Sequence, residues 1–244
     1  MKFTSLLVAG FIGFCLFLVP GLNLAHAEST MNCPAGTYDM LDWMTMDSDL
    51  RNNNHLVGSA NPMYSSVLSG KFYWTKGGNG FPWDIQLYDN NNIYLWVTEN
   101  GWGSPTTFKK FAGTNLPLAK RCAQGGFPGS TVTSSNTTYQ TYTDCNHFTT
   151  HNLQSSVNQV WGPYKLSFGG SLPSNLPTLV VSYRYNCDSG YNNCGDKEEY
   201  YLTQRYGLVQ WVHFTLVKGN YEQVQKSVFN WLKGGIATPN FPCF

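Results

Sequence analysis

The chain has 244 residues, of which 16% are aromatic and only 12% charged, and its 15 basic and 14 acidic side chains nearly cancel. A near-neutral chain without basic clusters lacks the electrostatic footprint for nucleic acid or an anionic membrane surface, and so many aromatic residues exclude a disordered protein. We therefore expect a folded protein that has no nucleic-acid partner and whose surface is polar rather than ionised.

The first 27 residues have the features of a signal peptide. Lys2 gives a positive start, the apolar run "LLVAGFIGFCLFLVPGL" follows, and "AHA" at 25–27 matches the small-x-small pattern of a signal-peptidase site. The alternative is an uncleaved membrane anchor, because the apolar run approaches the ~18 residues that a transmembrane helix needs. We predict a secreted or periplasmic protein that begins at Glu28, has no membrane contact after cleavage, and forms a single domain over 28–244.

The rest of the chain alternates short apolar segments with turn residues. A weak helical pattern, "DMLDWM" at 39–44, comes first. Clusters rich in Gly, Asn and Pro then separate segments of β-branched and aromatic residues, which is typical of a sandwich or barrel. We therefore predict a mainly β fold, an antiparallel β-sandwich of jelly-roll type. The expected strands are "KFYWT", "WDIQLY", "IYLWVTE", "YKLSF", "TLVVSYRYN", "EEYYLTQ" and "LVQWVHFTLV".

The segment "NYEQVQKSVFNWLKGG" at 220–235 has the pattern of an amphipathic helix. Asn220 and Gln223 have the spacing of a capping box, and the glycine pair at its end is a stop signal. We predict that this C-terminal helix packs on the sandwich through one apolar face, formed by Val224, Val228, Trp231 and Leu232.

The cysteines that remain after cleavage are even in number, which indicates disulfides in an exported chain. They are Cys33, Cys122, Cys145, Cys187, Cys194 and Cys243. The sequence does not choose among the fifteen ways of pairing six cysteines. We expect a local bridge from Cys187 to Cys194, a second from Cys122 to Cys145, and a third from Cys33 to Cys243 that ties the ends of one domain.

The predicted strand "LVQWVHFTLV" at 208–217 has two different faces. Side chains two residues apart share a face of a strand, so Trp211, His213 and Thr215 stand together. The opposite face is nearly all apolar. We predict that Trp211 and His213 face a ligand and that the core receives Val212, Phe214 and Leu216.

The segments 83–88 and 93–98 divide in the same way. Their mixed polar and aromatic sets are Asp84, Gln86 and Tyr88 on the first and Tyr94, Trp96 and Thr98 on the second. A connecting loop with an odd number of residues aligns these two sets, and burial of the apolar residues favours that register. In "TLVVSYRYN", Arg184 alternates with Tyr183 and Tyr185.

If these strands lie in one sheet, they form a surface of aromatic platforms and hydrogen-bonding groups. Sugars match such a surface, because their C–H faces stack on rings while their hydroxyls need donors and acceptors. An ordinary solvent-facing sheet made of good strand formers is the alternative. We predict a lectin-like, carbohydrate-binding protein whose partner is a polysaccharide or glycan. The predicted ligand-binding residues are Asp84, Gln86, Tyr88, Tyr94, Trp96, Arg184, Trp211 and His213.

Enzymes that act on polysaccharides are alternatives on the same face. A lyase would use His213 or a tyrosine such as Tyr88 to take a proton, with Arg184 to neutralise a uronate carboxylate. A glycoside hydrolase needs two carboxylates, and the sequence leaves open Asp84 with Glu198 or Glu199. A third class is a structural or adhesive envelope protein, whose aromatic residues would contact another protein.

Motifs for a metal or a cofactor are weak. His147 and His151 have a zinc-like spacing, but they lie in a Thr-rich segment that reads as strand or loop, and no glutamate stands between them. The chain has no G-x-S-x-G elbow, no phosphate-binding glycine loop and no dinucleotide fingerprint. We expect neither a metal nor a cofactor.

Overall fold

The computed structural model describes residues 31–45, 63–68, 71–76, 82–99, 107–113, 115–135, 137–153, 155–170, 172–229 and 243. The predicted signal peptide and its cleavage site before Glu28 lie outside these residues. The described elements are a short helix, α1 (Met40–Met44), and the strands β1 (Thr37–Asp39), β2 (Met63–Leu68), β3 (Lys71–Lys76), β4 (Pro82–Tyr88), β5 (Asn92–Glu99), β6 (Phe108–Phe111), β7 (Pro117–Lys120), β8 (Cys122–Gln124), β9 (Thr131–Ser134), β10 (Thr137–Tyr142), β11 (Phe148–Leu153), β12 (Ser155–Leu166), β13 (Leu176–Cys187), β14 (Cys194–Thr203), β15 (Gly207–Val217) and β16 (Asn220–Val228).

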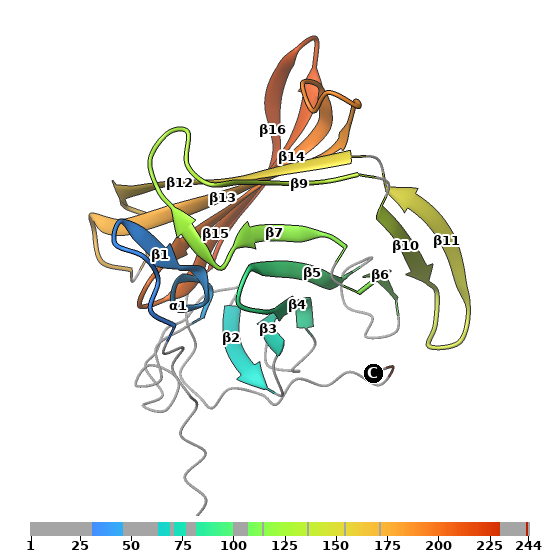
Figure 1. Ribbon diagram of the computed structural model, residues 1–244, viewed down its shortest axis with the longest axis horizontal. Coiled ribbons are helices and arrows are strands. Elements are labelled where there is room, and N and C mark those ends of the chain that lie inside the picture. Colours follow the sequence, from blue (N-terminus) through green and yellow to red (C-terminus); the bar gives the residue numbers. More distant parts are fainter. Residues whose placement is uncertain are drawn as a thin grey trace, which may run out of the picture.

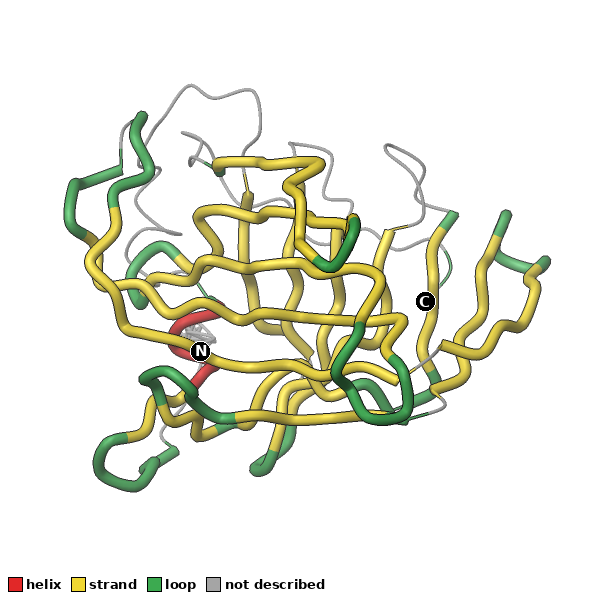
Figure 2. Tube along the Cα trace, turned by 90° about the horizontal axis from the view of Figure 1, so that it is seen from above, coloured by secondary structure: helices red, strands yellow, loops and turns green. Residues whose placement is uncertain are grey.

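The strands form two main antiparallel sheets, which confirms the predicted mainly β, sandwich-like fold. The six-stranded sheet has the order β16-β15-β14-β13-β12-β9, and the eight-stranded sheet has the order β11-β10-β6-β5-β4-β3-β2 with β7 paired to β5. Figure 1 shows the two sheets as two layers, and Figure 2 shows strands of one layer running across those of the other. Strand neighbours mostly follow chain order, so the topology is a meander and not the jelly roll that we expected.

The core lies between the two sheets and beside α1. Trp74 of β3 is fully buried, and its ring centre lies 5.4 Å from that of Tyr200 in β14. The indole Nε1 of Trp74 donates a hydrogen bond of 2.9 Å to the carbonyl oxygen of Met44. Asp39 caps α1, because its Oδ1 accepts the backbone N–H of Leu41 at 3.0 Å. The helical pattern expected at 39–44 is therefore confirmed, and α1 is fixed to the same core as both sheets.

The predicted C-terminal helix is wrong in the part that the structure describes, because the chain from 220 to 228 forms strand β16. Lys218 and Gly219 have φ values of +50° and +81°. Positive φ at both central residues is the signature of a type I′ hairpin, which returns the chain along β15. Val224 is the extra residue in a bulge of β16. It is 57% exposed, so it does not belong to the buried apolar helix face that we predicted. The residues from 230 to 235 lie outside the described part.

A β-bulge divides the hairpin formed by β4 and β5 into two registers. Gln86 pairs with Leu95 near the turn, which contradicts the register that we predicted there. Trp96 is then an extra residue on β5, and beyond it Asp84 pairs with Thr98, as predicted. A single bulge thus lets the apolar and the mixed residues of β5 exchange faces halfway along the strand.

Three disulfides pair all six predicted cysteines: Cys33–Cys122, Cys145–Cys243 and Cys187–Cys194. The local pair is confirmed, and the two longer pairs that we expected, Cys122–Cys145 and Cys33–Cys243, are wrong. Cys33 is bonded to Cys122 because β1 pairs with β8, which sets Asp39 opposite Cys122. This pairing brings the Cα atoms of Cys33 and Cys122 to a distance of 5.4 Å. Three disulfides fit an extracellular or secreted protein.

Within the described residues, the single helix α1 is far too short to cross a membrane. The predicted membrane-spanning alternative concerns the first 27 residues, which the structure does not describe.

Candidate functional site

A cavity of about 390 Å³ lies between the two sheets. Strands β4 and β5 supply one wall, strands β13 to β16 supply the other, and residues of β6 and β10 close the side between them. The lining combines carboxyl groups with aromatic rings, and Lys109 adds a cation. The carboxyl groups are Asp84, Glu99 and Glu198, and the aromatic rings include Trp83, Tyr183, Tyr185, Tyr200 and Trp211.

Glu198 of β14 is held by three hydrogen bonds from neutral donors. Its Oε2 accepts the Tyr200 hydroxyl at 2.6 Å and the Trp211 Nε1–H at 2.9 Å. Its Oε1 accepts the Tyr185 hydroxyl at 3.3 Å. Tyr200 and Trp211 occupy opposing positions on β14 and β15, so the sheet register itself places both donors beside the carboxylate. Hydrogen bonds to a carboxylate are stronger than those between neutral groups, so Glu198 has a fixed orientation.

The next residue, Glu199, has a structural role and is not among the residues that line the cavity. It points to the other face of β14, where its Oε2 accepts the Tyr201 hydroxyl at 2.7 Å. Its Oε1 accepts the Lys197 ammonium at 2.9 Å. Both glutamates therefore bind a tyrosine two residues further on, but only Glu199 also forms an ion pair with a neighbouring lysine. The described partners of Glu198 are instead the neutral donors Tyr185, Tyr200 and Trp211.

Asp84 of β4 lies across the cavity from the sheet that carries Glu198. Its side chain is 2% exposed, and its Oδ1 has no hydrogen-bond partner among the described residues. Burial raises the pKa of Asp84 well above its usual range, a hydrogen bond with Thr98 opposes this shift, and the charges of Glu198 and Glu99 add to it. The direction of this shift favours the protonated form of Asp84, whereas an ordinary exposed aspartate is ionised at neutral pH.

Aromatic rings make up much of the cavity wall. The ring centre of Trp83 lies 5.5 Å from that of Trp211 and 6.3 Å from that of Tyr200. On β13, Tyr183 and Tyr185 stack with ring centres 4.8 Å apart. Burial, and then the charge of Glu198, raises the pKa of Tyr183, Tyr185 and Tyr200, so their hydroxyls stay protonated as hydrogen-bond donors.

Trp83 reaches the cavity because of a bulge. Trp74 pairs with Asp84 and Thr75 pairs with Pro82, so Trp83 is an extra residue on β4. An extra residue bends the strand and redirects its side chain, which explains why two consecutive residues, Trp83 and Asp84, both line the cavity.

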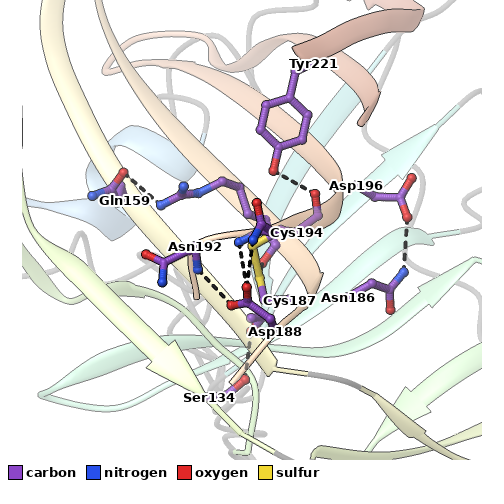
Figure 3. Close-up of a disulfide and its surroundings, with 12 residues drawn as sticks. Ser134, Gln159, Asn186, Cys187, Asp188, Asn192, Cys194, Asp196 and Tyr221 are labelled. Carbon is purple, nitrogen blue, oxygen red and sulfur yellow. Dashed lines mark hydrogen bonds between the residues drawn. A yellow bond between two sulfur atoms is a disulfide. The ribbon is translucent and has the colours of Figure 1, made fainter. Parts of the chain in front are cut away.

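One end of the cavity is fixed by the hairpin of β13 and β14. The Cys187–Cys194 disulfide joins the two strands there (Figure 3). Asn186, which lines the cavity, donates its side-chain N–H to Asp196 Oδ2 at 3.1 Å. The Tyr221 hydroxyl of β16 donates to the Cys194 carbonyl oxygen at 2.9 Å. These bonds hold the ends of three strands together and so keep the tyrosines of β13 in place.

Of the eight predicted ligand-binding residues, Asp84 and Trp211 line the cavity. His213 lies just beyond the lining, with its Nε2 3.5 Å from the Tyr185 hydroxyl and 3.4 Å from Asp196 Oδ1. Alternation correctly predicted that Trp211 and His213 share a face. That face points toward the space between the sheets, since Trp211 belongs to the main core.

Gln86 and Tyr88 are not among the lining residues of the cavity. Gln86 is completely buried, and both polar atoms of its amide have no partner within the described part of the chain. Tyr88 is half-buried against the core, and the guanidinium of Arg121 lies 5.1 Å from its ring centre. These two residues continue the Asp84 face of β4 toward the turn.

Tyr94, Trp96 and Arg184 lie away from the cavity. The Tyr94 hydroxyl donates to Asp89 Oδ2 at 3.0 Å and thereby closes the turn after β4. Trp96 packs with the cluster on the far side of the eight-stranded sheet, where the Lys71 ammonium lies 4.3 Å from its ring centre. Arg184 donates to Gln159 Oε1 at 3.3 Å.

The structure therefore does not assemble the predicted lyase group. Arg184 follows Tyr183 and precedes Tyr185, which both line the cavity, so it points to the opposite face of β13. Tyr88 is also outside the cavity lining. By contrast, Asp84 and Glu198, one of the two carboxylate pairs that the sequence left open, share the cavity.

Sequence reasoning did not select Trp83, Tyr183, Tyr185, Glu198 and Tyr200 as ligand-binding residues. For the residues of β13 and β14 a signal was present. In "DKEEYYL", Glu198 and Tyr200 alternate with Glu199 and Tyr201, so each pair occupies one face. Alternation shows the pairs but not which of them faces the second sheet.

Comparisons with family models, with curated proteins and with solved structures found no match to this chain.

Proposed function

We propose that this protein binds a carbohydrate in the cavity between its two sheets. The observation that carries the proposal is the joint presence of an oriented glutamate, Glu198, a buried aspartate, Asp84, whose Oδ1 has no partner within the described residues, and aromatic walls. A sugar hydroxyl both donates and accepts, so it can donate to Glu198 while another hydroxyl accepts from Asp84. The C–H faces of the ring would pack on Trp83 and Trp211.

The size of the cavity supports a small ligand or the end of a longer one. Pockets for small molecules span roughly 300–1,000 Å³, and this cavity of about 390 Å³ is at the low end of that range. We expect one sugar unit or two to enter, rather than a polysaccharide lying along a flat sheet. The site is a partly open cavity between the sheets, and not the aromatic surface of one sheet that the sequence predicted.

We further propose that the protein acts outside the cytoplasm, where free sugars and glycan ends are accessible. The three disulfides and the signal-peptide pattern of the first 27 residues support this location. The envelope-adhesin alternative has less support. The large apolar side chains exposed in the described residues belong to four different elements, namely Phe127 before β9, Phe148 of β11, Tyr164 of β12 and Val224 of β16.

The proposal is tested by passing purified protein, with its disulfides intact, over a panel of immobilised mono- and oligosaccharides. We expect retention on a defined subset and at least tenfold weaker retention of the Glu198→Gln variant. The matched control is Glu199→Gln, which changes the neighbouring buried glutamate on the opposite face of β14 and should be retained like the wild type. Absence of retention across the panel, or equal losses in the two variants, would overturn the proposal.

A further inference from the structure

The cavity brings together two carboxyl groups from opposite sheets, Asp84 of β4 and Glu198 of β14. Glycoside hydrolysis needs such a pair on either side of a glycosidic bond, one as the acid and the other to assist the attack. We propose that the cavity hydrolyses a glycosidic bond, with Asp84 as the general acid and Glu198 as the base for water. This inference rests on the proposed carbohydrate binding and adds a reaction to it.

The environment of Asp84 suits the acid. The residue is almost fully buried and lines the cavity, and its Oδ1 is unpartnered within the described residues. Burial favours the protonated form of a carboxyl, and the glycosidic oxygen of a bound sugar is an acceptor for such a proton. The direction of the Asp84 pKa, well above its usual range, agrees with this role.

The environment of Glu198 suits the base. Its Oε2 is occupied by the short bonds from Tyr200 and Trp211, at 2.6 and 2.9 Å. Its Oε1 has only the longer bond from Tyr185, at 3.3 Å, and is the oxygen left to accept a proton from water. Its described hydrogen-bond donors are neutral side chains, whereas Glu199 forms an ion pair with Lys197.

The reaction is a single displacement in which atoms and charges balance. A water molecule attacks the anomeric carbon of the bound sugar and gives one proton to Glu198 Oε1. The bond from that carbon to the glycosidic oxygen breaks, and Asp84 donates its proton to the leaving oxygen. Transfer of the proton from Glu198 back to Asp84 through solvent restores both groups. Because water displaces the leaving group in one step from the opposite side of the anomeric carbon, the proposed reaction inverts the anomeric configuration.

Two kinds of substrate separate the two roles. A 4-nitrophenyl glycoside has a leaving group that needs no proton, whereas a methyl glycoside or an unmodified oligosaccharide needs one. Asp84→Asn should therefore slow the cleavage of unmodified oligosaccharides by about 10²-fold or more and that of nitrophenyl glycosides much less. Glu198→Gln should slow both by about 10²-fold or more, and Glu199→Gln should slow neither.

The experiment measures released reducing ends and nitrophenolate for the sugars that the protein retains, and NMR identifies the anomer formed first. We expect inverted product and the substrate-dependent loss in Asp84→Asn. Retention of a sugar without any cleavage would overturn this inference and leave the proposed binding function intact, whereas no retention of any sugar would overturn both. Equal losses of both substrates in Asp84→Asn, or a retained configuration, would also overturn it.

Discussion

Asp84→Asn is expected to change how the stability of the protein depends on pH. Burial and the neighbouring carboxylates raise the pKa of Asp84 in the folded state well above its usual value of 3.8, the value expected in the unfolded chain. Between these two pKa values the folded protein holds one proton more than the unfolded chain. The free energy of unfolding contributed by this group is therefore complete below the unfolded pKa and is lost as pH rises toward the folded pKa.

The size of the expected change in stability follows from the one proton by which the folded and the unfolded states differ. A difference of one bound proton changes the free energy of unfolding by about 1.4 kcal/mol per pH unit. Asparagine is close to aspartic acid in shape and does not titrate. The free energy of unfolding of the variant therefore does not fall with rising pH through this group. The stability of Asp84→Asn minus that of the wild type should rise by about 1.4 kcal/mol per pH unit above pH ~5, and level off at the folded pKa of Asp84.

The assay is urea unfolding of both proteins, with disulfides intact, at intervals between pH 4.5 and 8. Asp188→Asn is the control, because hydrogen bonds from the Asn192 backbone and its neighbours lower the pKa of that exposed aspartate. The pH-dependent part of its contribution lies below its usual pKa of 3.8, so the difference between Asp188→Asn and the wild type should stay flat over this range. A difference between wild type and Asp84→Asn that stays flat over this range would refute the assignment of Asp84 as a buried acid.

Three further outcomes follow from the described contacts. Trp211→Phe keeps a ring in the cavity wall but removes the Nε1–H donor to Glu198, so calorimetric titration should show about tenfold weaker sugar binding, equivalent to about 1.4 kcal/mol. Gly219→Ala meets no atom within 4 Å but must adopt a φ of +81°, so chemical denaturation should show a loss of about 1 kcal/mol, and an unchanged midpoint would argue against the β15–β16 turn. Replacing both Cys187 and Cys194 by serine opens a loop with a sequence separation of 7 and should cost about 2–3 kcal/mol of stability in the same assay.

Period-two alternation predicted the parts of the site that lie on regular strands. It placed Trp211 and His213 on one face of β15 and Asp84 and Gln86 on one face of β4, because regular pleating is independent of the rest of the fold. The same pattern does not state which face meets the second sheet. We expected the mixed faces to form an open surface, yet Trp211 is 8% exposed and lines a cavity between the two sheets.

The errors arose where local geometry depends on the tertiary structure. The bulge at Trp96 turns that ring to the outer side, and the bulge at Trp83 turns another ring inward, so the two tryptophans exchanged the roles that strict alternation predicts. The segment after Gly219 has helical spacing of its apolar residues. Its backbone N–H and C=O groups nevertheless form their hydrogen bonds by pairing with β15 along a whole strand. Disulfide partners are likewise set by strand pairing, as the Cys33–Cys122 bridge beside β1 and β8 illustrates.

The most direct test of the central claim is a crystal structure of the protein soaked with a sugar that it retains. The account predicts density between β4 and β14, with sugar hydroxyls within hydrogen-bond distance of Glu198 and Asp84 and the ring against Trp83 or Trp211. Density on the outer faces, beside Trp96 or Arg184, with an empty cavity would contradict it.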